Sequence, residues 1–332
     1  MPKNKNKPTP TPNPNPNSPR TQRGYKLSGG EFVPERLSVR DQNPPQAAVQ
    51  WFPGHMARTR RLIKESLPLV DAVVELRDAR APDSSRNPEL RALIGQKPCI
   101  VLLNKCDLAD ADATQRWLRS LRQENAAALA VDCRSGRGLQ LFPQLVKDTL
   151  AETLRRNADK GMTNRPLRLM AVGIPNVGKS SFINRLAGRS RAEVADLPGV
   201  TRRNQWYVAG QVGGVTIELL DTPGVLWPKF EDQAVGEKLA FLGSVKDQVV
   251  DTEALALRLL EVLKAGYAPR LAERFGLEDI ETQPPWALLE QIARRRGMLL
   301  RGSEADTRRA AAALLDELRG GKLGRITFDF TD

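Results

Sequence analysis

Residues 173–180 have the types and spacing of a phosphate-binding loop. The segment reads Gly-Ile-Pro-Asn-Val-Gly-Lys-Ser, which matches the pattern G-x-x-x-x-G-K-S, and it lies between a predicted strand at 167–172 and a predicted helix at 179–186. In such a loop the backbone amides curl around phosphate oxygens, and the helix N-terminus adds a favourable dipole. The pattern therefore predicts a site for a nucleoside triphosphate.

Two side chains of this loop have expected chemical roles. Lys179 would reach the β- and γ-phosphates during transfer, and the Ser180 hydroxyl would bind Mg²⁺. The loop residues predicted to line the nucleotide are Pro175, Asn176, Val177, Gly178, Lys179, Ser180 and Ser181. The triphosphate follows from this segment alone, whereas the identity of the base needs a second motif.

That second motif is Asn-Lys-Cys-Asp at 104–107, directly after the apolar run 99–103. Asp107 would accept hydrogen bonds from guanine N1 and N2, a pair of donors that adenine lacks. The wrong base would leave a buried carboxylate unpaired, so this residue selects GTP over ATP. Asn104 and Lys105 complete the predicted base-binding set.

A further loop at 131–136, Val-Asp-Cys-Arg-Ser-Gly, follows the next predicted strand, where a base-contacting loop is expected. GTPases commonly have Ser-Ala at the place of Asp132 and Cys133, so the side chains depart from the usual pattern. The backbone amide of Cys133 could still meet guanine O6. The predicted contact therefore comes from the backbone rather than from the thiol.

Two more segments are expected to sense the γ-phosphate and Mg²⁺. Asp221-Thr-Pro-Gly224 follows the strand-like run 215–220, so that Asp221 would hold Mg²⁺ through water and the Gly224 amide would sense the γ-phosphate. Pro-Gly-Val-Thr at 198–201 precedes it, and Thr201 is placed to close on Mg²⁺ and the γ-phosphate. An ordinary loop threonine is the alternative for Thr201.

The order of the motifs is unusual. In Ras-like GTPases, which this motif set resembles, the phosphate loop comes first and N-K-x-D comes late, whereas here residues 104–107 precede 173–180. A circular permutation keeps all sheet contacts when the old chain ends are joined at the surface, and 156–166 is the expected joint. The segment after Asp221 then leads directly into the C-terminal part of the chain, so that a γ-phosphate-dependent movement would pull on it.

Hydrophobic patterning predicts an α/β fold. Strands alternate with helices from residue 51 to about 235, which indicates a three-layer, mostly parallel sheet, and helices alone follow. The expected strands are 70–76, 99–103, 129–131, 167–172, 205–209 and 215–220. The expected helices are 58–67, 114–124, 138–156, 179–186, 251–265, 285–296 and 304–319. We therefore expect a circularly permuted P-loop GTPase domain at 48–235 and a smaller all-helical domain at 236–332.

Composition restricts the partners. The 332 residues have a net charge of +12, and the basic surplus points to a polyanion, most often nucleic acid, or only to solubility. One histidine and three cysteines without a C-x-x-C pair argue against a zinc site and favour a reducing, cytoplasmic location. No apolar run approaches the ~18 residues of a membrane span, so no membrane partner is expected.

Residues 1–47 form a predicted disordered tail. Prolines alternate with Thr and Asn at 8–16, and such a segment buries too little apolar area to offset the entropy of ordering. Alternating proline also argues against an amphipathic targeting helix. A basic arm that settles on RNA and an inert extension are equally consistent with this segment.

The chain resembles the ribosome biogenesis GTPase A family, the YlqF/RbgA type. The permuted order carries the resemblance together with four segments, which are Trp-Phe-Pro-Gly-His-Met at 51–56, Asp-Ala-Arg at 78–80, Ser-Ser-Arg-Asn-Pro at 84–88 and Asp-Thr-Pro-Gly-Val-Leu-Trp-Pro-Lys-Phe at 221–230. It covers about residues 48–330. The family implies a monomeric GTPase that binds the assembling large ribosomal subunit, with its rRNA and ribosomal proteins, aids late maturation and leaves after hydrolysis. Its helical C-terminal domain would contact rRNA.

The resemblance also concerns hydrolysis. Ras-like enzymes place a glutamine just after D-x-x-G to orient water, and here that position is Val225, which cannot do so. His55 matches the histidine that the family is proposed to use instead, and a neutral imidazole could orient or deprotonate the water. Asn176 matches an asparagine that supports K⁺ binding in related enzymes, which would add positive charge. The alternatives are a helix-capping His55 and a loop-shaping Asn176.

Two other function classes compete with the GTPase. A P-loop kinase for a small substrate would share the phosphate loop, but N-K-x-D and the threonine segment argue against it. A non-catalytic RNA-binding scaffold could use GTP structurally. Stimulation of GTP hydrolysis by ribosomes would exclude the scaffold.

Overall fold

A computed structural model of the chain describes residues 24–26, 32–34, 53–188, 205–222, 224, 232–245 and 250–331, with backbone alone at 24–26, 32–34, 53–59 and 205. Residues 1–45 and 46–332 form separate compact units. In the first unit, strands β1 (Gly24–Lys26) and β2 (Phe32–Pro34) pair antiparallel within the segment for which disorder is predicted. The rest of that tail lies outside the described residues.

The second unit contains a six-stranded sheet with the order β5-β4-β3-β6-β8-β7. All neighbouring pairs are parallel except β7 with β8. The strands are β3 (Ala72–Asp78), β4 (Cys99–Asn104), β5 (Ala127–Ala130), β6 (Leu167–Gly173), β7 (Gln205–Val212) and β8 (Val215–Asp221). All seven residues of β3 are buried, because a central parallel strand is covered on both faces. Burial on both faces explains why the strand begins with consecutive apolar residues.

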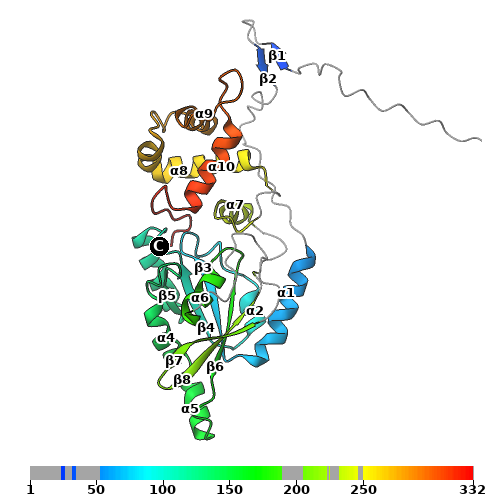
Figure 1. Ribbon diagram of the computed structural model, residues 1–332, viewed down its shortest axis with the longest axis vertical. Coiled ribbons are helices and arrows are strands. Elements are labelled where there is room, and N and C mark those ends of the chain that lie inside the picture. The colour runs from blue at the N-terminus through cyan, green and yellow to red at the C-terminus, as the bar shows by residue number, and fades with distance from the viewer. Residues whose placement is uncertain are drawn as a thin grey trace, which may run out of the picture. The chain divides into compact units, whose positions relative to one another are not determined.

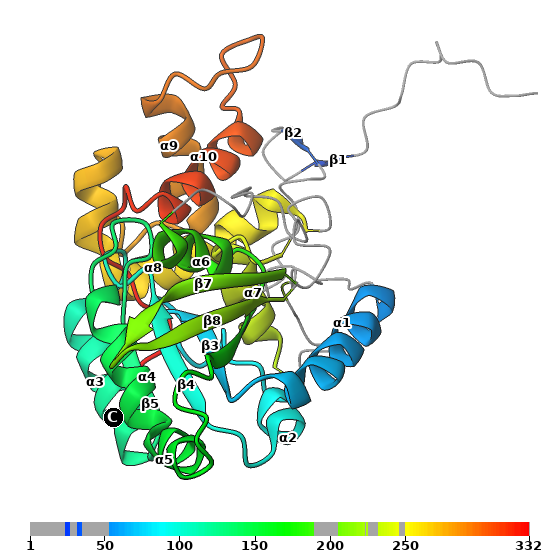
Figure 2. The same ribbon diagram turned by 60° about the horizontal axis from the view of Figure 1, so that its bottom comes forward.

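Helices cover both faces of this sheet, which confirms the predicted three-layer α/β fold. On one face, α1 (Pro53–Ser66), α2 (Leu90–Ile94) and α3 (Ala111–Gln123) bury Ile63, Ile94 and Leu118. Figure 2 shows α1 and α2 together at one side of the strands. On the other face, α4 (Phe142–Thr149) and α6 (Lys179–Ala187) join a larger core, where the rings of Phe142 and Phe182 meet edge to face at 5.2 Å.

The segment 156–166, expected as the permutation joint, contains the end of α5 (Ala151–Asp159) and the turn that leads into β6. The predicted helix 138–156 is instead a 3₁₀ turn, η3 (Leu139–Leu141), followed by α4 and α5, because the backbone leaves helical geometry at Leu150 (φ −105, ψ 20). The other strand and helix predictions in this region are correct to within a few residues.

Helices alone follow β8 in the described part of the chain. They are α7 (Gln233–Phe241), α8 (Thr252–Phe275), α9 (Pro285–Arg295) and α10 (Thr307–Arg319). The sequence misses α7 and ends the next helix ten residues early. In α8 a kink at Tyr267 (φ −140, ψ 26) comes just before Pro269, so the proline occupies the first turn of the second half, where its missing N–H is tolerated. None of the described helices has the length and apolarity of a bilayer-spanning segment.

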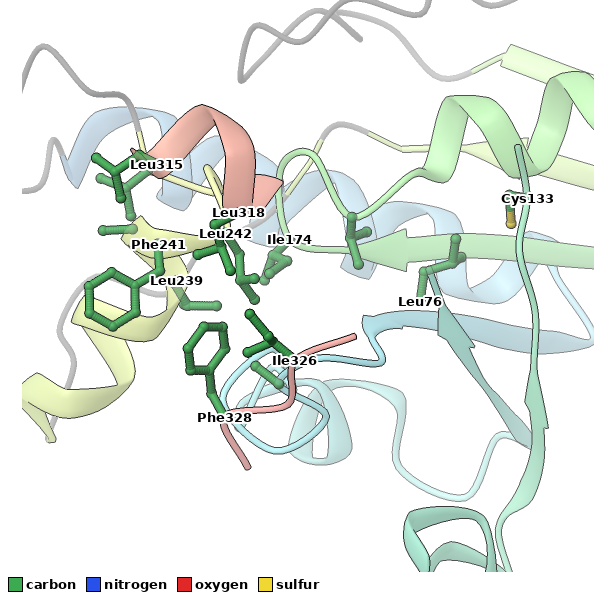
Figure 3. Packing of buried hydrophobic residues seen from close by; sticks show 14 of the residues in the cluster. Leu76, Cys133, Ile174, Leu239, Phe241, Leu242, Leu315, Leu318, Ile326 and Phe328 are labelled. Atoms are coloured by element: carbon green, nitrogen blue, oxygen red, sulfur yellow. The ribbon is translucent and has the colours of Figure 1, made fainter. Parts of the chain in front are cut away.

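The core continues from the sheet through α7 into α8–α10. Figure 1 shows α7 between the strands and the C-terminal helices, and Figure 3 shows the side chains that meet there. Ile174 of the phosphate loop, Leu239 and Phe241 of α7, and Leu318 of α10 belong to one buried cluster. The division at residues 235 and 236 stays a prediction.

Candidate active site

The phosphate loop connects β6 to α6 and uses left-handed backbone at two positions. Asn176 has φ 57 and Gly178 has φ 102. A Cβ atom on Gly178 would lie 2.2 Å from Asn104 Nδ2, so a glycine is required by a close neighbour as well as by its backbone conformation. This loop therefore has the geometry that its sequence pattern predicts.

Lys179 begins α6 and points back into the loop. Its side chain is buried, and Nζ donates hydrogen bonds to Gly173 O at 3.0 Å and Ile174 O at 2.9 Å. Burial lowers the pKa of Lys179 from 10.5 to about 8, although the charge of Asp221 opposes the shift. The ammonium group is thus held where an anion would both pair with it and restore its charge. Ser180 and Ser181 follow, half-buried, in the first turn of the helix.

Asp221 and Gly224 lie beside the phosphate loop. Asp221 ends β8, is 2% exposed, and pairs in register with Ala171 of β6. A Cβ atom on Gly224 would lie 3.0 Å from Pro175 Cα and 3.2 Å from Lys179 Nζ, which places the Gly224 backbone against the loop. The carboxylate of Asp221 and the hydroxyl of Ser180 are hard oxygen donors, so this set of residues fits Mg²⁺.

Asn104, at the end of β4, joins the base-binding loops to the phosphate loop. Its Nδ2 donates to Val177 O at 2.7 Å, and its Oδ1 accepts from Cys133 N at 3.0 Å. The side chain is 3% exposed. Asn104 therefore braces three loops from inside the protein, a role that its predicted place in the base-binding set does not reveal.

The Cys133 amide thus already has a partner. It would have to release Asn104 Oδ1 before it could donate to guanine O6. The contact with guanine stays a prediction, and the hydrogen bond to Asn104 competes with it. The next two amides are also occupied, since Arg134 N and Ser135 N donate to the Asp132 carboxylate at 2.8 and 3.2 Å. Burial raises the pKa of the Cys133 thiol above its ordinary range, which keeps this thiol protonated.

Lys105 and Asp107 occupy the rest of the N-K-x-D turn. Lys105 has φ 59, and its Nζ donates to Asn176 O at 2.7 Å and pairs with Asp78 at 3.1 Å. Burial disfavours the charged form of Asp78, but Arg80 and Lys105 together hold its pKa well below the usual range. The Asp107 carboxylate is half-buried and accepts no hydrogen bond from a described residue, which leaves it available for a base.

The Asp-Ala-Arg and Ser-Ser segments serve a different purpose from nucleotide contact. Arg80 is 1% exposed, pairs with Asp78 at 2.8 Å and donates to Leu318 O of α10 at 3.3 Å. Ser84 donates from its backbone N–H and its hydroxyl to Asp329, near the C-terminus. These segments therefore hold the C-terminal part of the chain on the sheet.

A contact that sequence reasoning missed joins the phosphate loop to α7. Asn176 Nδ2 donates to Gly243 O, just after α7, at 2.8 Å. Arg319 of α10 donates to the carbonyls of Ala240 and Phe241 at the end of the same helix, at 2.9 and 3.1 Å. Since these partners are 67 or more residues apart, no local pattern could indicate them.

The structure brings most predicted site residues to one edge of the sheet. Asn104, Gly173 and Asp221 all end parallel strands, and this carboxyl edge is where open α/β sheets bind ligands. His55 lies in the first turn of α1, where only the backbone is described. Thr201 and Val225 lie outside the described residues.

Comparisons with known proteins agree with this arrangement. Residues 168–273 match a family described as 50S ribosome-binding GTPase. The ribosome biogenesis GTPase A of Priestia megaterium is 45% identical over 85% of this chain and 96% of its own, and that of Thermotoga maritima is 30% identical over 85% and 94%. Two YlqF structures, one bound to GDP and one from T. maritima bound to GNP, superpose with TM-scores of 0.56 and 0.57. Their identities are 28% and 27%, they cover 81% and 82% of this chain, and 99% and 98% of each YlqF chain is matched.

Proposed function

Because the chain belongs to the ribosome biogenesis GTPase A family and is a GTP hydrolase, we propose that it binds the assembling large ribosomal subunit, promotes late maturation and dissociates on GTP hydrolysis. The proposed partners are the precursor particle, its rRNA and its ribosomal proteins, and the protein acts as a cytoplasmic monomer. The name of a further relative, the mitochondrial ribosome-associated GTPase 1 of Xenopus tropicalis, 36% identical, supports a ribosomal partner.

One observation carries this proposal: α7 contacts both the phosphate loop and the C-terminal helices. Asn176 of the phosphate loop holds Gly243, and Arg319 of α10 holds the last carbonyls of α7. The N-cap of α7, Asp232, comes only eight residues after Gly224. A change at the γ-phosphate would therefore reach the surface of α8–α10 through packed structure rather than through a free linker.

The surface of α9, α10 and the loop between them suits an RNA partner. Arg301, Arg308 and Arg309 are exposed and pair with no acidic side chain among the described residues, whereas Arg294 and Arg295 pair with Glu290 and Glu278. Leu299 and Leu300 are 46% and 52% exposed beside them. A cluster of exposed arginines without acidic partners is the electrostatic footprint expected of a nucleic-acid-binding surface.

Each residue of the proposed site has a separate role. Asn104, Lys105, Asp107 and Cys133 hold the base side, the loop from Pro175 to Ser181 holds the phosphates, and the Gly224 amide senses the γ-phosphate. Ser180, Thr201 and Asp221 are the proposed Mg²⁺ ligands, and Mg²⁺ when bound offsets the charge that develops on the phosphates. His55, Lys179 and Thr201 are the proposed catalytic residues, and the amide of Asn176 supports K⁺.

Co-sedimentation tests the proposal. Immature large subunits, with small subunits as the control particle, are incubated with the protein and either GDP or a non-hydrolysable GTP analogue. We expect co-sedimentation with the large-subunit precursor and the GTP analogue, and little with GDP or with small subunits. Equal binding in the two nucleotide states would contradict the switch.

Hydrolysis on the particle tests the catalytic assignment. His55→Ala should slow particle-stimulated GTP hydrolysis by at least about a hundredfold, the lower end of the range for loss of a general base, while nucleotide affinity stays unchanged. An unchanged stimulated rate would remove His55 from the mechanism. Replacing K⁺ by Na⁺ in the same assay tests the proposed role of Asn176, because a rate indifferent to the cation would exclude it.

A further inference from the structure

We infer that Asp329 is a positioning residue for GTP: it anchors α7 so that Gly224 keeps its place beside Lys179. The inference rests on the proposed role of Gly224 as the sensor of the γ-phosphate. It goes beyond that role, because Asp329 lies near the C-terminus, outside every nucleotide-binding motif.

The Asp329 carboxylate joins two separate parts of the molecule. Oδ2 accepts hydrogen bonds from the backbone amides of Asp83 and Ser84 at 3.0 and 2.7 Å, and Oδ1 accepts from the Ser84 hydroxyl at 2.9 Å. Oδ1 also pairs with Lys238 of α7 at 2.7 Å. The Asp329 side chain is 6% exposed and that of Lys238 30% exposed, so the pair is largely shielded from solvent. Such a pair couples its two elements more strongly than an exposed one does.

The position of Asp329 is set by the sheet and not by α7 alone. Its carbonyl accepts from Trp117 Nε1 of α3 at 2.9 Å. The preceding residues are also bonded, with Phe328 N donating to Arg80 O at 2.6 Å and Ile326 N donating to Leu108 O, beside Asp107, at 3.0 Å. Residues 326–329 therefore form a strap fixed to the loops after β3 and β4, and the carboxylate at its end is a rigid anchor for α7.

The apolar side of the strap reinforces the same contact. Phe328 packs against Phe241 of α7 with ring centroids 5.7 Å apart, and Ile326 lies in the same cluster (Figure 3). The apolar contact holds α7 close but is not directional. The ion pair with Lys238 adds a directional contact, because it joins one face of the helix to one atom of the strap.

The arrangement held in this way is one that favours a triphosphate. Gly224 already lies against Pro175 and close to Lys179 Nζ, the group expected to meet the γ-phosphate. Asn176 of the phosphate loop also donates to Gly243, just after α7, at 2.8 Å, so the setting of α7 is coupled to the loop against which Gly224 lies. Loss of the anchor should therefore weaken binding of GTP specifically, because GDP has no γ-phosphate to be sensed.

Nucleotide binding by the full-length protein tests this inference. The dissociation constants of a non-hydrolysable GTP analogue and of GDP are measured for the wild type, Asp329→Asn and Lys238→Met. We expect each variant to bind the GTP analogue about fivefold more weakly, a size usual for coupled pairs, and GDP within about twofold of the wild type. The double variant should lose no more than either single one, since both remove the same interaction.

Ser84→Ala is the matched control. It removes one hydrogen bond to Asp329 but leaves the pair with Lys238, so it should lower thermal stability without changing the ratio of the two dissociation constants. A merely structural Asp329 would lower both affinities together or neither, and either result overturns the inference, as does tighter binding of the GTP analogue. Failure of the proposed function is distinguished by the co-sedimentation experiment, in which the wild type would then bind the particle equally in both nucleotide states.

Discussion

The Asn104 side-chain amide donates to the Val177 carbonyl at 2.7 Å, so the base-binding and phosphate-binding loops share one buried hydrogen bond. The same amide accepts from Cys133 N, and it fills the space above Gly178 that a Cβ atom would need. One residue thus sets the distance between the part of the site that reads the base and the part that holds the phosphates. A bound nucleotide would span this distance, so we expect its affinity to depend on Asn104 even without a direct contact.

Asn104→Ala should lower both stability and nucleotide affinity. The change leaves Val177 O and Cys133 N without their buried partner, which costs about 1–3 kcal/mol in the free energy of unfolding. We expect GDP and GTP affinities to fall together by at least about tenfold, which corresponds to ~1.4 kcal/mol. Chemical denaturation and nucleotide titration measure the two effects.

Gln115→Ala, on the exposed side of α3, is the control for this substitution. It should change the unfolding free energy by less than about 0.5 kcal/mol. Nucleotide affinity in Asn104→Ala equal to that of the wild type would show that the loops hold their spacing without the brace.

Gly178→Ala should be far more harmful than Gly188→Ala. Both glycines have positive φ, 102 and 64, so both substitutions introduce backbone strain of about 1–2 kcal/mol. Among the described residues, only at Gly178 would the new methyl group meet another atom, Asn104 Nδ2 at 2.2 Å, whereas no described atom lies within 4 Å at Gly188. Thermal unfolding and GDP binding of the two variants separate the effect of backbone strain from that of the steric clash. Equal losses of stability and affinity in both variants would contradict the proposed contact.

Lys179 should titrate near pH 8 in the free protein. Burial lowers its folded pKa from 10.5 to about 8, so between these values the unfolded chain binds more protons and the unfolding free energy rises with pH. Bound phosphates should reverse the shift and raise the pKa again. Nuclear magnetic resonance of ¹³C-labelled lysine, assigned with Lys179→Arg, would follow both states. A free-protein pKa above about 10 would contradict the effect of burial.

Asp107→Asn should change the preferred base. A carboxylate accepts the two N–H groups of guanine, whereas an amide can donate to the additional oxygen of xanthine. The dissociation constants for GTP and xanthosine triphosphate should therefore reverse their order, with GTP weakened by at least about a hundredfold. Retained preference for GTP would refute the role of Asp107 as the guanine reader.

The phosphate loop, N-K-x-D and the mostly parallel sheet could be predicted because each rests on neighbouring residues. The apolar residues of 99–104 predict a buried strand, and the N-K-x-D motif begins at the last residue of that strand. Motif order alone then indicated the permutation. Positions of loops at the carboxyl edge follow from these strands, since parallel strands end together.

The contacts between distant segments could not be predicted in the same way. Asn176 meets Gly243 at a separation of 67 residues and Lys238 meets Asp329 at 91, and nothing local indicates either pair. Helix α7 escaped detection because Gly236 and Glu237 are buried along with its apolar residues, so the usual one-sided pattern is missing. Arg80 is almost fully buried. Because very few arginines in proteins are, its burial could not be expected from its residue type.

The central claim, that hydrolysis releases the protein from the large-subunit precursor, is tested most directly by a single-turnover measurement. The purified complex of labelled protein, precursor particle and GTP is followed for phosphate formation and for release of the label in one sample. We predict that release follows hydrolysis with the same rate constant and stops when a non-hydrolysable analogue replaces GTP. Release at an unchanged rate with the analogue, or continued binding after GTP is consumed, would contradict the account.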